Sequence, residues 1–260
     1  MGPLTNYDRL FGLIGYPLSH SFSKKYFSEK FEQESITGAC YELFPIPEIE
    51  DLSVLLAQHP NLAGLNVTIP YKQAVLPYLD TLSPGAAAVG AVNTIRCTAG
   101  KLEGFNTDVI GFETSLRSWL EDARGGWSGM KALVLGTGGA AKAVAFVLDR
   151  LGIPFQWVSR TAGPNRLSYR QITSEVLSAH HLLINTTPLG MSPHTGSKPD
   201  LPYNALSSAH YLYDLVYNPA VTAFMQAGRH QGATVKNGLE MLHGQAEAAW
   251  RIWTTEEHGK

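Results

Sequence analysis

The sequence predicts an α/β protein, and three observations support that class. Short apolar segments that suit buried strands alternate along the chain with segments of helical periodicity. Residues 131–141 read as a buried strand, a glycine-rich turn and the start of a helix. Charged residues make up 16% of the chain, against about 25% in typical globular domains, which suits strands buried on both faces. A chain of 260 residues accommodates one large or two modest domains.

Bulk properties exclude several functional classes. A net charge of −2 gives no electrostatic reason for binding nucleic acid or a membrane surface. No apolar run approaches the roughly 20 residues of a membrane span, and the start lacks a basic-then-apolar signal segment. Cys40 and Cys97 form neither a disulfide framework nor a metal spacing. We therefore expect a cytoplasmic protein that holds no metal. A small-molecule substrate and a monomeric or homodimeric state are expected as well.

The first half is predicted to alternate strands and helices. The expected strands are residues 9–15, 39–45 and 62–70, followed by a hairpin of 91–96 with 101–108 around a turn at 98–100. The expected helices are residues 24–34, 47–58, 71–79 and 109–119.

Three alternate serines lie between the first strand and the first helix. Ser19, Ser21 and Ser23 follow the strand that ends at Gly15. One serine is enough to cap the helix, since its hydroxyl accepts from a free backbone N–H. The additional hydroxyls suit a small anionic ligand such as a carboxylate. The spacing alone leaves both interpretations open.

Further polar residues follow the next strands of this half. Asn66 and Thr68 alternate onto one face of their strand, and Lys72 lies just past its end. A lysine there is usually a solvated surface charge, but active sites of open α/β sheets lie at such carboxyl ends, so both interpretations stand. Asn93 interrupts an apolar run, and Asp108 precedes a helix, where a negative charge is favourable in any protein.

The second half is organised around the glycine-rich turn. Expected strands are residues 131–135, 153–158, 181–185, 211–219 and 232–237, and expected helices are 140–151, 168–179, 220–228 and a final one that carries 241–250. Residues 125–129 are linker-like. The spacing Gly136-x-Gly138-x-x-Ala141 fits the dinucleotide-binding fingerprint, in which the turn approaches a pyrophosphate and the helix N-terminus faces it. Such a turn also serves plain strand-to-helix corners, but the strand–helix–strand context favours a dinucleotide.

The segment after the second strand of this half indicates which dinucleotide is bound. NAD-specific sites carry an acidic residue there, whereas this chain has Ser159, Arg160 and Thr161. A guanidinium suits a 2′-phosphate because its charge is permanent and its donors form a fork. The sequence therefore favours NADP, with Arg166 as a possible second partner of the phosphate. His194 is interpreted as a loop residue rather than a ligand.

Six segments together resemble one enzyme family. They are Gly15–Ser23, Asn66–Lys72, Ala91–Thr94, Gly104–Asp108, Asp214–Pro219 and Gly238–Gln245. In this order they are similar to the shikimate dehydrogenase family. The resemblance implies a substrate-binding domain with a mixed sheet, residues 1–106 plus 241–260, and a Rossmann-like NADP-binding domain, residues 107–240, with a cleft between them.

The resemblance also implies roles for individual residues. Ser21 and Ser23 would hold a carboxylate, Lys72 would be the general acid/base, and Asp108 would align it. The implied substrate-binding residues are Ser21, Ser23, Asn66, Thr68, Asn93, Asp108, Tyr217 and Gln245. The implied cofactor-binding residues are Gly136, Thr137, Gly138, Gly139, Ala140, Ser159, Arg160, Thr161, Thr187, Leu215 and Gly238. Two positions depart from the family pattern: Lys24 replaces a usual proline and Ser159 a usual asparagine.

The activity implied by the resemblance is the reversible, NADPH-dependent reduction of 3-dehydroshikimate to shikimate in the biosynthesis of chorismate and aromatic amino acids. Two alternatives remain at this point. One is a quinate/shikimate dehydrogenase that uses NAD or NADP. The other is a non-catalytic NADP-binding regulator on the same scaffold.

Overall fold

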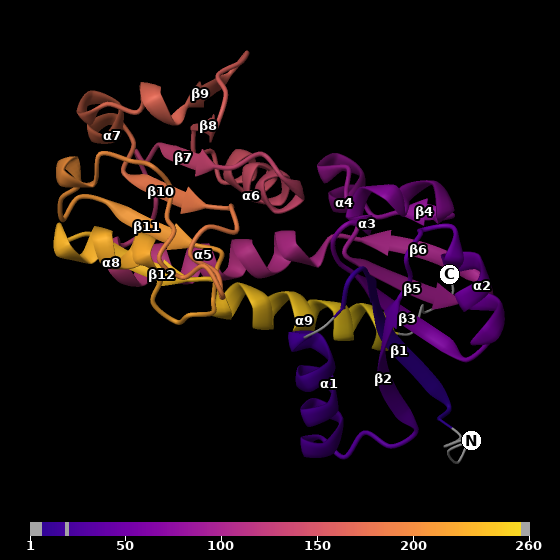
Figure 1. Ribbon diagram of the computed structural model, residues 1–260. Helices are drawn as coiled ribbons and strands as arrows, with labels where there is room; N and C mark the ends of the chain where they lie inside the picture. Colours follow the sequence, from indigo (N-terminus) through magenta and orange to yellow (C-terminus); the bar gives the residue numbers. More distant parts are fainter. Residues whose placement is uncertain (1–6, 19–20, 256–260) are drawn as a thin grey trace. The chain divides into compact units, whose positions relative to one another are not determined.

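The chain folds into two compact units, and both have the α/β class that the alternation of strands and helices predicted. The computed structural model describes residues 7–18 and 21–255 (Figure 1). Unit 1 comprises Met1–Thr107 together with Ala246–Lys260, and unit 2 comprises Asp108–Gln245.

Unit 1 contains a mixed sheet. Its described strands lie in the order β2 (Ala39–Pro45), β1 (Arg9–Gly15), β3 (Leu62–Val67), β5 (Thr94–Thr98), β6 (Lys101–Phe105) and β4 (Thr81–Leu82). β1 runs parallel to β2 and β3, whereas β5 runs antiparallel to both β3 and β6. The β5–β6 pair is the predicted hairpin, closed by Ala99 and Gly100 in left-handed conformations.

Helices cover both faces of this sheet. One face packs against α1 (Phe22–Gln33) and the last two turns of α9 (Leu239–Thr254). The other packs against α2 (Asp51–Gln58), α3 (Tyr71–Ala74), the 3₁₀ turn η1 (Leu76–Tyr78) and α4 (Pro84–Val89). Alternation along β1 serves both cores, because Leu10 and Ile14 face the second layer while Phe11 and Leu13 face the first.

The end of α9 is an integral part of unit 1. The Trp253 indole stacks on Phe11 with ring centroids 5.0 Å apart, and its Nε1 donates to the carbonyl oxygen of Ile95 at 2.9 Å. Gly64 makes room for it, since a Cβ there would lie 2.3 Å from the indole nitrogen. A bulky indole thus lies flat on the strand because one residue lacks a side chain.

A polar cluster joins α9 to α1. The Glu247 carboxylate accepts from Lys30 Nζ at 2.9 Å and from the Tyr26 hydroxyl. The Lys30 side chain is only 9% exposed and also pairs with Glu34 at 2.7 Å. Partial burial opposes ionisation of Glu247, but the hydrogen bonds from Tyr26 and Lys30 outweigh it and lower its pKa.

We expect Glu247→Ala to lower the free energy of unfolding by about 1–2 kcal/mol at neutral pH, because a nearly buried ammonium loses one of its two carboxylates. A lowered folded-state pKa stabilises the protein above the ordinary value of 4.5, and this contribution disappears as the pH falls through the folded-state pKa. Thermal midpoints measured at neutral pH and near pH 3 should therefore show a deficit that shrinks in acid.

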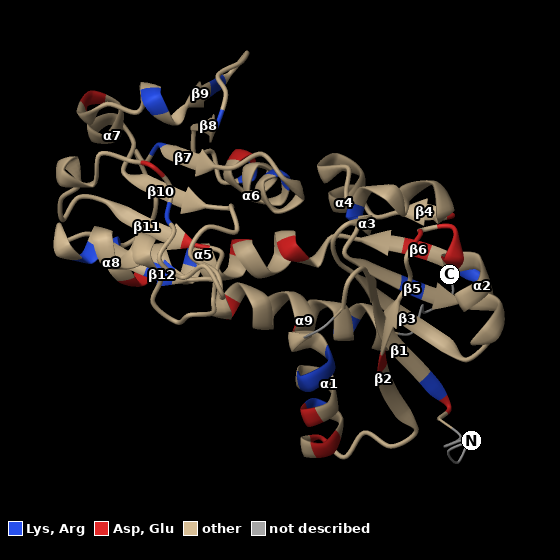
Figure 2. Ribbon diagram, in the orientation of Figure 1, with Lys and Arg blue, Asp and Glu red and all other residues tan. Residues whose placement is uncertain are grey.

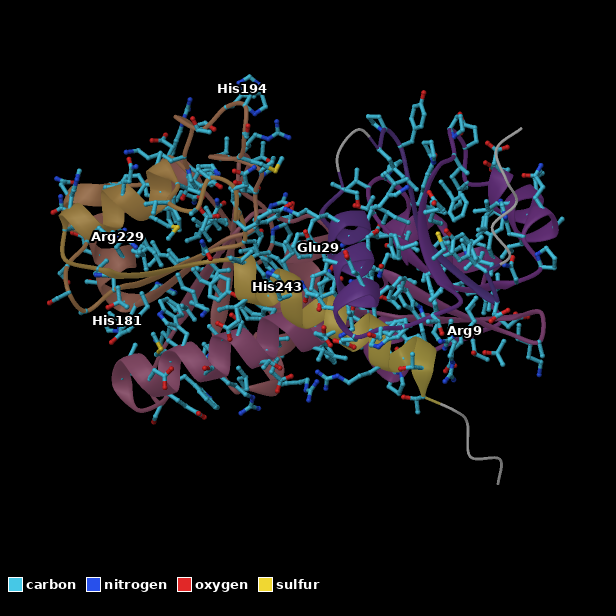
Figure 3. All side chains as sticks on the ribbon, turned by 90° about the horizontal axis from the view of Figure 1, so that it is seen from below. Arg9, Glu29, His181, His194, Arg229 and His243 are labelled. Carbon is cyan, nitrogen blue, oxygen red and sulfur yellow. The ribbon has the colours of Figure 1, made fainter. Side chains whose placement is uncertain are left out.

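Glu29→Ala is the matched control, since Glu29 lies on the same helix as Lys30, labelled in Figure 3, and its exposed side chain pairs with the exposed Lys25 at 3.7 Å. Its midpoint should stay close to that of the parent protein. Equal midpoints for the two variants at neutral pH would contradict the assignment.

Unit 2 contains a parallel sheet in the order of a doubly wound nucleotide-binding fold. Its described strands are β12 (Thr234–Asn237), β11 (Tyr211–Asp214), β10 (Leu182–Asn185), β7 (Ala132–Leu135), β8 (Phe155–Ser159) and β9 (Arg166–Ser168). Every neighbouring pair is parallel. The strand order reverses between β7 and β10, and ligands of such sheets bind beyond the carboxyl ends at this switch point.

Both faces of the second sheet are covered as well. α5 (Thr107–Arg124) packs Phe112 and Trp119 edge-on against Tyr213, whose hydroxyl donates to Ser115 at 2.8 Å. The opposite core gathers side chains from α7 (Ser174–Ala179), the 3₁₀ turn η3 (Tyr203–Ala205) and α8 (Ala223–His230). α6 (Gly139–Arg150) links β7 to β8. Buried helices on both sides explain the low fraction of charged residues.

Several predicted boundaries are wrong. The expected helix 71–79 ends as an α-helix at Ala74 and continues as the 3₁₀ turn η1, because Pro77 has no N–H to continue the α-helical hydrogen bonds. The expected helix 168–179 shrinks to α7, because Thr173 caps it and residues 166–171 form β9 and the 3₁₀ turn η2 (Tyr169–Gln171). α8 begins after Thr222, whose side chain caps Met225 N, and not at Asn218-Pro219. α2 starts at Asp51 rather than 47, and α5 is longer than 109–119.

Candidate functional site

The glycine-rich turn connects β7 to α6 in unit 2. The described geometry leaves open space over it, because a Cβ on Gly138 or on Gly139 would meet no heavy atom within 4 Å. α6 begins at Gly139, so its first backbone N–H groups lack partners within the helix and its positive dipole end faces this space. The turn therefore forms a cradle that fits a pyrophosphate.

Gly136 is required for a different reason. Its φ of +117° is rarely available to residues with a side chain, and a Cβ would lie 2.5 Å from Thr186 Oγ1. The Thr186 hydroxyl donates to the carbonyl oxygen of Leu135 at 2.7 Å, and Thr186 N donates to the same oxygen at 3.0 Å. The chain after β10 thus packs directly on the turn after β7, at the switch point.

We expect Gly136→Ala to destabilise the protein by about 1–3 kcal/mol, because alanine must adopt a strained φ and displace Thr186. Gly138→Ala should change stability by no more than about 0.5 kcal/mol, since its φ of −77° suits alanine and its Cβ enters open space. Denaturation of the two variants without nucleotide tests this. Equal destabilisation would refute the distinction.

The segment after β8 carries the predicted phosphate-binding residues. The Ser159 hydroxyl donates to the carbonyl oxygen of Thr161 at 2.8 Å and accepts from Thr161 N at 3.3 Å, so the turn around the exposed Arg160 is closed on itself. Arg166 lies beside this turn, and its Nε donates to the same Thr161 oxygen at 3.1 Å. Arg160 therefore lies in a turn that Arg166, at the start of β9, helps to hold in place.

The ends of β10, β11 and β12 bring the remaining predicted cofactor residues of unit 2 together. Thr187 donates its hydroxyl to Asn185 Oδ1 at 2.6 Å. Leu215 N donates to the Asn185 carbonyl oxygen at 2.9 Å. Gly238 lies against Leu215, since a Cβ there would be 2.2 Å from the Leu215 carbonyl oxygen. Thr187, Leu215 and Gly238 thus lie along the ends of β10, β11 and β12.

Ser21 and Ser23 lie at the start of α1 in unit 1. Ser21 is the helix cap, because its Oγ accepts from Lys24 N at 3.3 Å. Capping uses a lone pair of the hydroxyl and leaves its hydrogen available, so capping and binding of a carboxylate are compatible. Ser23 lies in the first turn and hydrogen-bonds the buried Tyr41 hydroxyl. Ser19 falls outside the described residues.

Lys24 replaces the usual proline without disturbing this helix start. Its backbone N–H makes the capping bond to Ser21, and its side chain pairs with Glu42 of β2 at 2.6 Å. The departure from the family pattern is therefore accommodated.

Asn66 and Asn93 are held by a buried network in unit 1, and Thr68 lies half-buried beside it. Asn93 Oδ1 accepts from Thr107 N at 2.7 Å, which fixes that end of the amide. Asn66 Oδ1 accepts from the Tyr41 hydroxyl at 2.8 Å, and its Nδ2 contacts the Asn93 carbonyl oxygen at 3.4 Å. Thr68 follows β3, and its N–H donates to Ile14 at the end of β1. The network thus fixes the amides of Asn66 and Asn93, while a backbone hydrogen bond fixes the position of Thr68.

Lys72 and Asp108 are placed by separate elements. Lys72 lies in α3, and its carbonyl oxygen accepts from Val92 N at 2.7 Å, next to Asn93. Asp108 lies in the first turn of α5, directly after Thr107. Tyr217 follows β11, and Gln245 on α9 donates to the Leu242 carbonyl oxygen at 3.0 Å.

Sequence reasoning missed Tyr41 and Asp214. Tyr41 is fully buried, and that burial raises the pKa of its phenol. Asp214 is also fully buried, and burial raises its pKa to about 6 although Thr222, Val216 and Asn185 donate to it. The signal for Asp214 was a charged residue at the end of an apolar strand, since such residues are seldom buried without partners.

The described residues offer little support for a metal site, a charged binding surface or a membrane span. Among residues 7–18 and 21–255, no three His, Cys, Asp or Glu side chains form a group suited to a metal. His194 lies at the outer edge of the loop after β10, as predicted for a loop residue (Figure 3). Basic and acidic residues are interspersed in both units (Figure 2). In the described part of the chain, no helix combines the length and the apolar character needed to cross a bilayer.

The fold and the cradle define a class, and the comparisons identify the family. A doubly wound parallel sheet with an open glycine turn and an arginine after its second strand defines a dinucleotide-binding α/β protein. Residues 13–95 match the family described as the shikimate dehydrogenase substrate binding domain. The shikimate dehydrogenase (NADP(+)) of Caldanaerobacter subterraneus subsp. tengcongensis is 37% identical over 264 residues, covering 95% of this chain and 92% of that protein. The chain belongs to the shikimate dehydrogenase family.

Solved structures agree with this assignment. The shikimate 5-dehydrogenase of Thermus thermophilus, in complex with NADP(H) and shikimate, superposes with a TM-score of 0.79 at 33% identity, covering 95% of this chain and 93% of that one. The quinate dehydrogenase of Corynebacterium glutamicum, in complex with NAD, gives a TM-score of 0.82 at 30% identity, covering 96% and 94%. Two substrate preferences therefore occur on closely similar folds.

Proposed function

We propose that this protein is an NADP-dependent shikimate dehydrogenase that reversibly reduces 3-dehydroshikimate to shikimate. The similarity to NADP(+)-dependent relatives over almost the entire chain carries this conclusion. The cradle at Gly138 and Gly139 fits the pyrophosphate, and Arg160 with Arg166 supplies cations suited to a 2′-phosphate. When bound, NADPH supplies the hydride that reduces the ketone carbon.

Unit 1 supplies groups suited to a hydroxylated ring acid. The Ser21 and Ser23 hydroxyls stand at the N-terminus of α1, where a carboxylate is favoured by the helix dipole. The fixed Oδ1 of Asn93 makes its Nδ2 the end available to donate to a substrate hydroxyl. Thr68 offers a further hydroxyl beside the same strand ends. Asn66, Tyr217 and Gln245 are assigned to the substrate as well.

Lys72 is the general acid that donates a proton to the ketone oxygen as hydride reaches the carbon. In the oxidation of shikimate its neutral amine accepts the proton of the alcohol. Asp108 aligns the ammonium and a substrate hydroxyl.

Lys72→Ala should lower kcat about 10²- to 10⁴-fold, the usual value of acid/base assistance, while the protein stays folded. The assay follows the absorbance of NADPH formed from shikimate and NADP+. Lys25→Ala, on the exposed side of α1, is the control and should retain parental turnover. A Lys72→Ala enzyme with near-parental kcat would remove the acid/base assignment.

Arg160→Ala should raise KM for NADP+ about 10- to 100-fold, because a charge-assisted bond to the 2′-phosphate is lost. KM for NAD+ should hardly change, since NAD+ has no such phosphate. Steady-state kinetics with both nucleotides provide the test, with Arg170→Ala as the control in the neighbouring turn. A parallel rise for both nucleotides would argue against this contact.

The likeness to a quinate dehydrogenase bound to NAD makes a quinate/shikimate dehydrogenase the second candidate. The absence of an acidic residue at Ser159-Arg160-Thr161 favours NADP and speaks against it. Turnover of quinate with NAD+ at a rate comparable to that of shikimate with NADP+ would favour the second candidate. Tight NADPH binding without turnover of either acid would instead indicate a non-catalytic regulator.

A further inference from the structure

A buried carboxylate lies at the end of β11 in unit 2. The Asp214 side chain is fully buried and accepts from Asn185 Nδ2 at 2.9 Å, Val216 N at 3.0 Å and the Thr222 hydroxyl at 2.6 Å. All three donors are neutral. Burying a carboxylate on neutral donors is unfavourable compared with pairing it to a cation, so its retention calls for a role beyond packing.

On one side the carboxylate controls the loop after β10. A carboxylate accepts only, so it requires the NH₂ end of the Asn185 amide to face it. The Asn185 oxygen must then face the opposite way, where it accepts from Thr187 N at 3.1 Å and from the Thr187 hydroxyl at 2.6 Å. Asp214 thereby determines the orientation of Thr187 indirectly, through the amide of Asn185.

On the other side it controls the loop after β11. Val216 N binds the carboxylate directly, and the Val216 carbonyl oxygen accepts from Gly238 N at 3.3 Å. Between them, Leu215 lies against Gly238, with its N–H on the Asn185 carbonyl. The Thr222 hydroxyl, while donating to Asp214, also accepts from Met225 N and so starts α8. One carboxylate thus joins the ends of β10, β11 and β12.

We propose that Asp214 positions the nicotinamide half of NADP(H) without itself contacting the cofactor. It acts through its three hydrogen-bond donors, Asn185, Val216 and Thr222. These donors in turn hold the cofactor-binding residues Thr187, Leu215 and Gly238. This inference rests on the proposed function. The hydrogen bonds that close the Arg160 turn, from Ser159 and Arg166 to Thr161, involve none of these residues, so binding at that turn reports separately from the loops that Asp214 holds.

Asp214→Asn is the direct test, since it keeps the shape and replaces one acceptor oxygen by a donor. Asn185 Nδ2 and Val216 N donate to one carboxylate oxygen and the Thr222 hydroxyl donates to the other, so an amide in either orientation turns its NH₂ group toward a group that donates in the parent protein. The loops after β10 and β11 should shift, and a displacement of about 1 Å at a reacting centre costs up to about 10²-fold in rate.

The experiment compares two nucleotides on the full-length protein. Adenosine 2′,5′-bisphosphate carries the 2′-phosphate but no nicotinamide, whereas NADP+ carries both. For Asp214→Asn we expect the Kd of the bisphosphate to stay within about twofold of the parent, and kcat to fall at least about tenfold. The deuterium isotope effect with 4-deuterated NADPH should rise, because hydride transfer becomes slower than product release, and KM for shikimate should stay near the parental value.

Thr222→Ser and Thr222→Val form a second pair that keeps the test decisive if Asp214→Asn does not fold. Serine retains the hydroxyl and should preserve kcat, whereas valine removes it and should lower kcat with bisphosphate binding unchanged. The same selectivity between nucleotides is required of both Asp214→Asn and Thr222→Val.

Two results would overturn the inference. Equal weakening of bisphosphate and NADP+ binding would show that Asp214 supports unit 2 as a whole, and parental kcat in folded Asp214→Asn would show that it positions nothing. Failure of the proposed function is distinguishable from both, because the parent protein itself would then fail to reduce NADP+ with shikimate.

Discussion

The direct backbone contact between the turn after β7 and the chain after β10 is the constraint on which unit 2 depends. Gly136 lacks a side chain, so Thr186 can hydrogen-bond the Leu135 carbonyl oxygen with both its N–H and its hydroxyl. That carbonyl belongs to the last residue of a buried strand and would otherwise lack a partner. The contact therefore gives a buried carbonyl its hydrogen-bond partner. It also fixes the distance between the turn after β7 and the chain after β10, which border the switch point where a nucleotide binds.

Both units orient a site amide by fixing one of its two ends. In unit 1, Thr107 N donates to Asn93 Oδ1, and in unit 2 the Asp214 carboxylate accepts from Asn185 Nδ2. An amide carries a donor at one end and an acceptor at the other, so fixing one end determines what the other presents. In both cases the fixed partner is buried, where a mispaired polar group is most costly. One buried hydrogen bond to each amide thus determines whether that amide presents a donor or an acceptor to the site.

The sequence was informative where local chemistry decides the structure. Period-two alternation located the strands, and the glycine spacing located the turn after β7, because these features depend on neighbours along the chain. Helix starts were less predictable: several polar residues near α7 and α8 are able to cap, and tertiary packing selects Thr173 and Thr222. The buried role of Asp214 was not predictable either, since its partners Asn185 and Thr222 come from different elements.

The return of α9 to the first sheet has a consequence for how the chain acquires its structure during translation. Trp253 fills the layer over Phe11 and Gly64, so the first 107 residues leave the ribosome long before the indole that completes their core has been made. The residues of unit 2 are contiguous in the sequence, so unit 2 can fold before α9 is complete. During that time Phe11 of unit 1 lacks its contact with Trp253. The segment that is synthesised first is consequently the segment whose core is completed last.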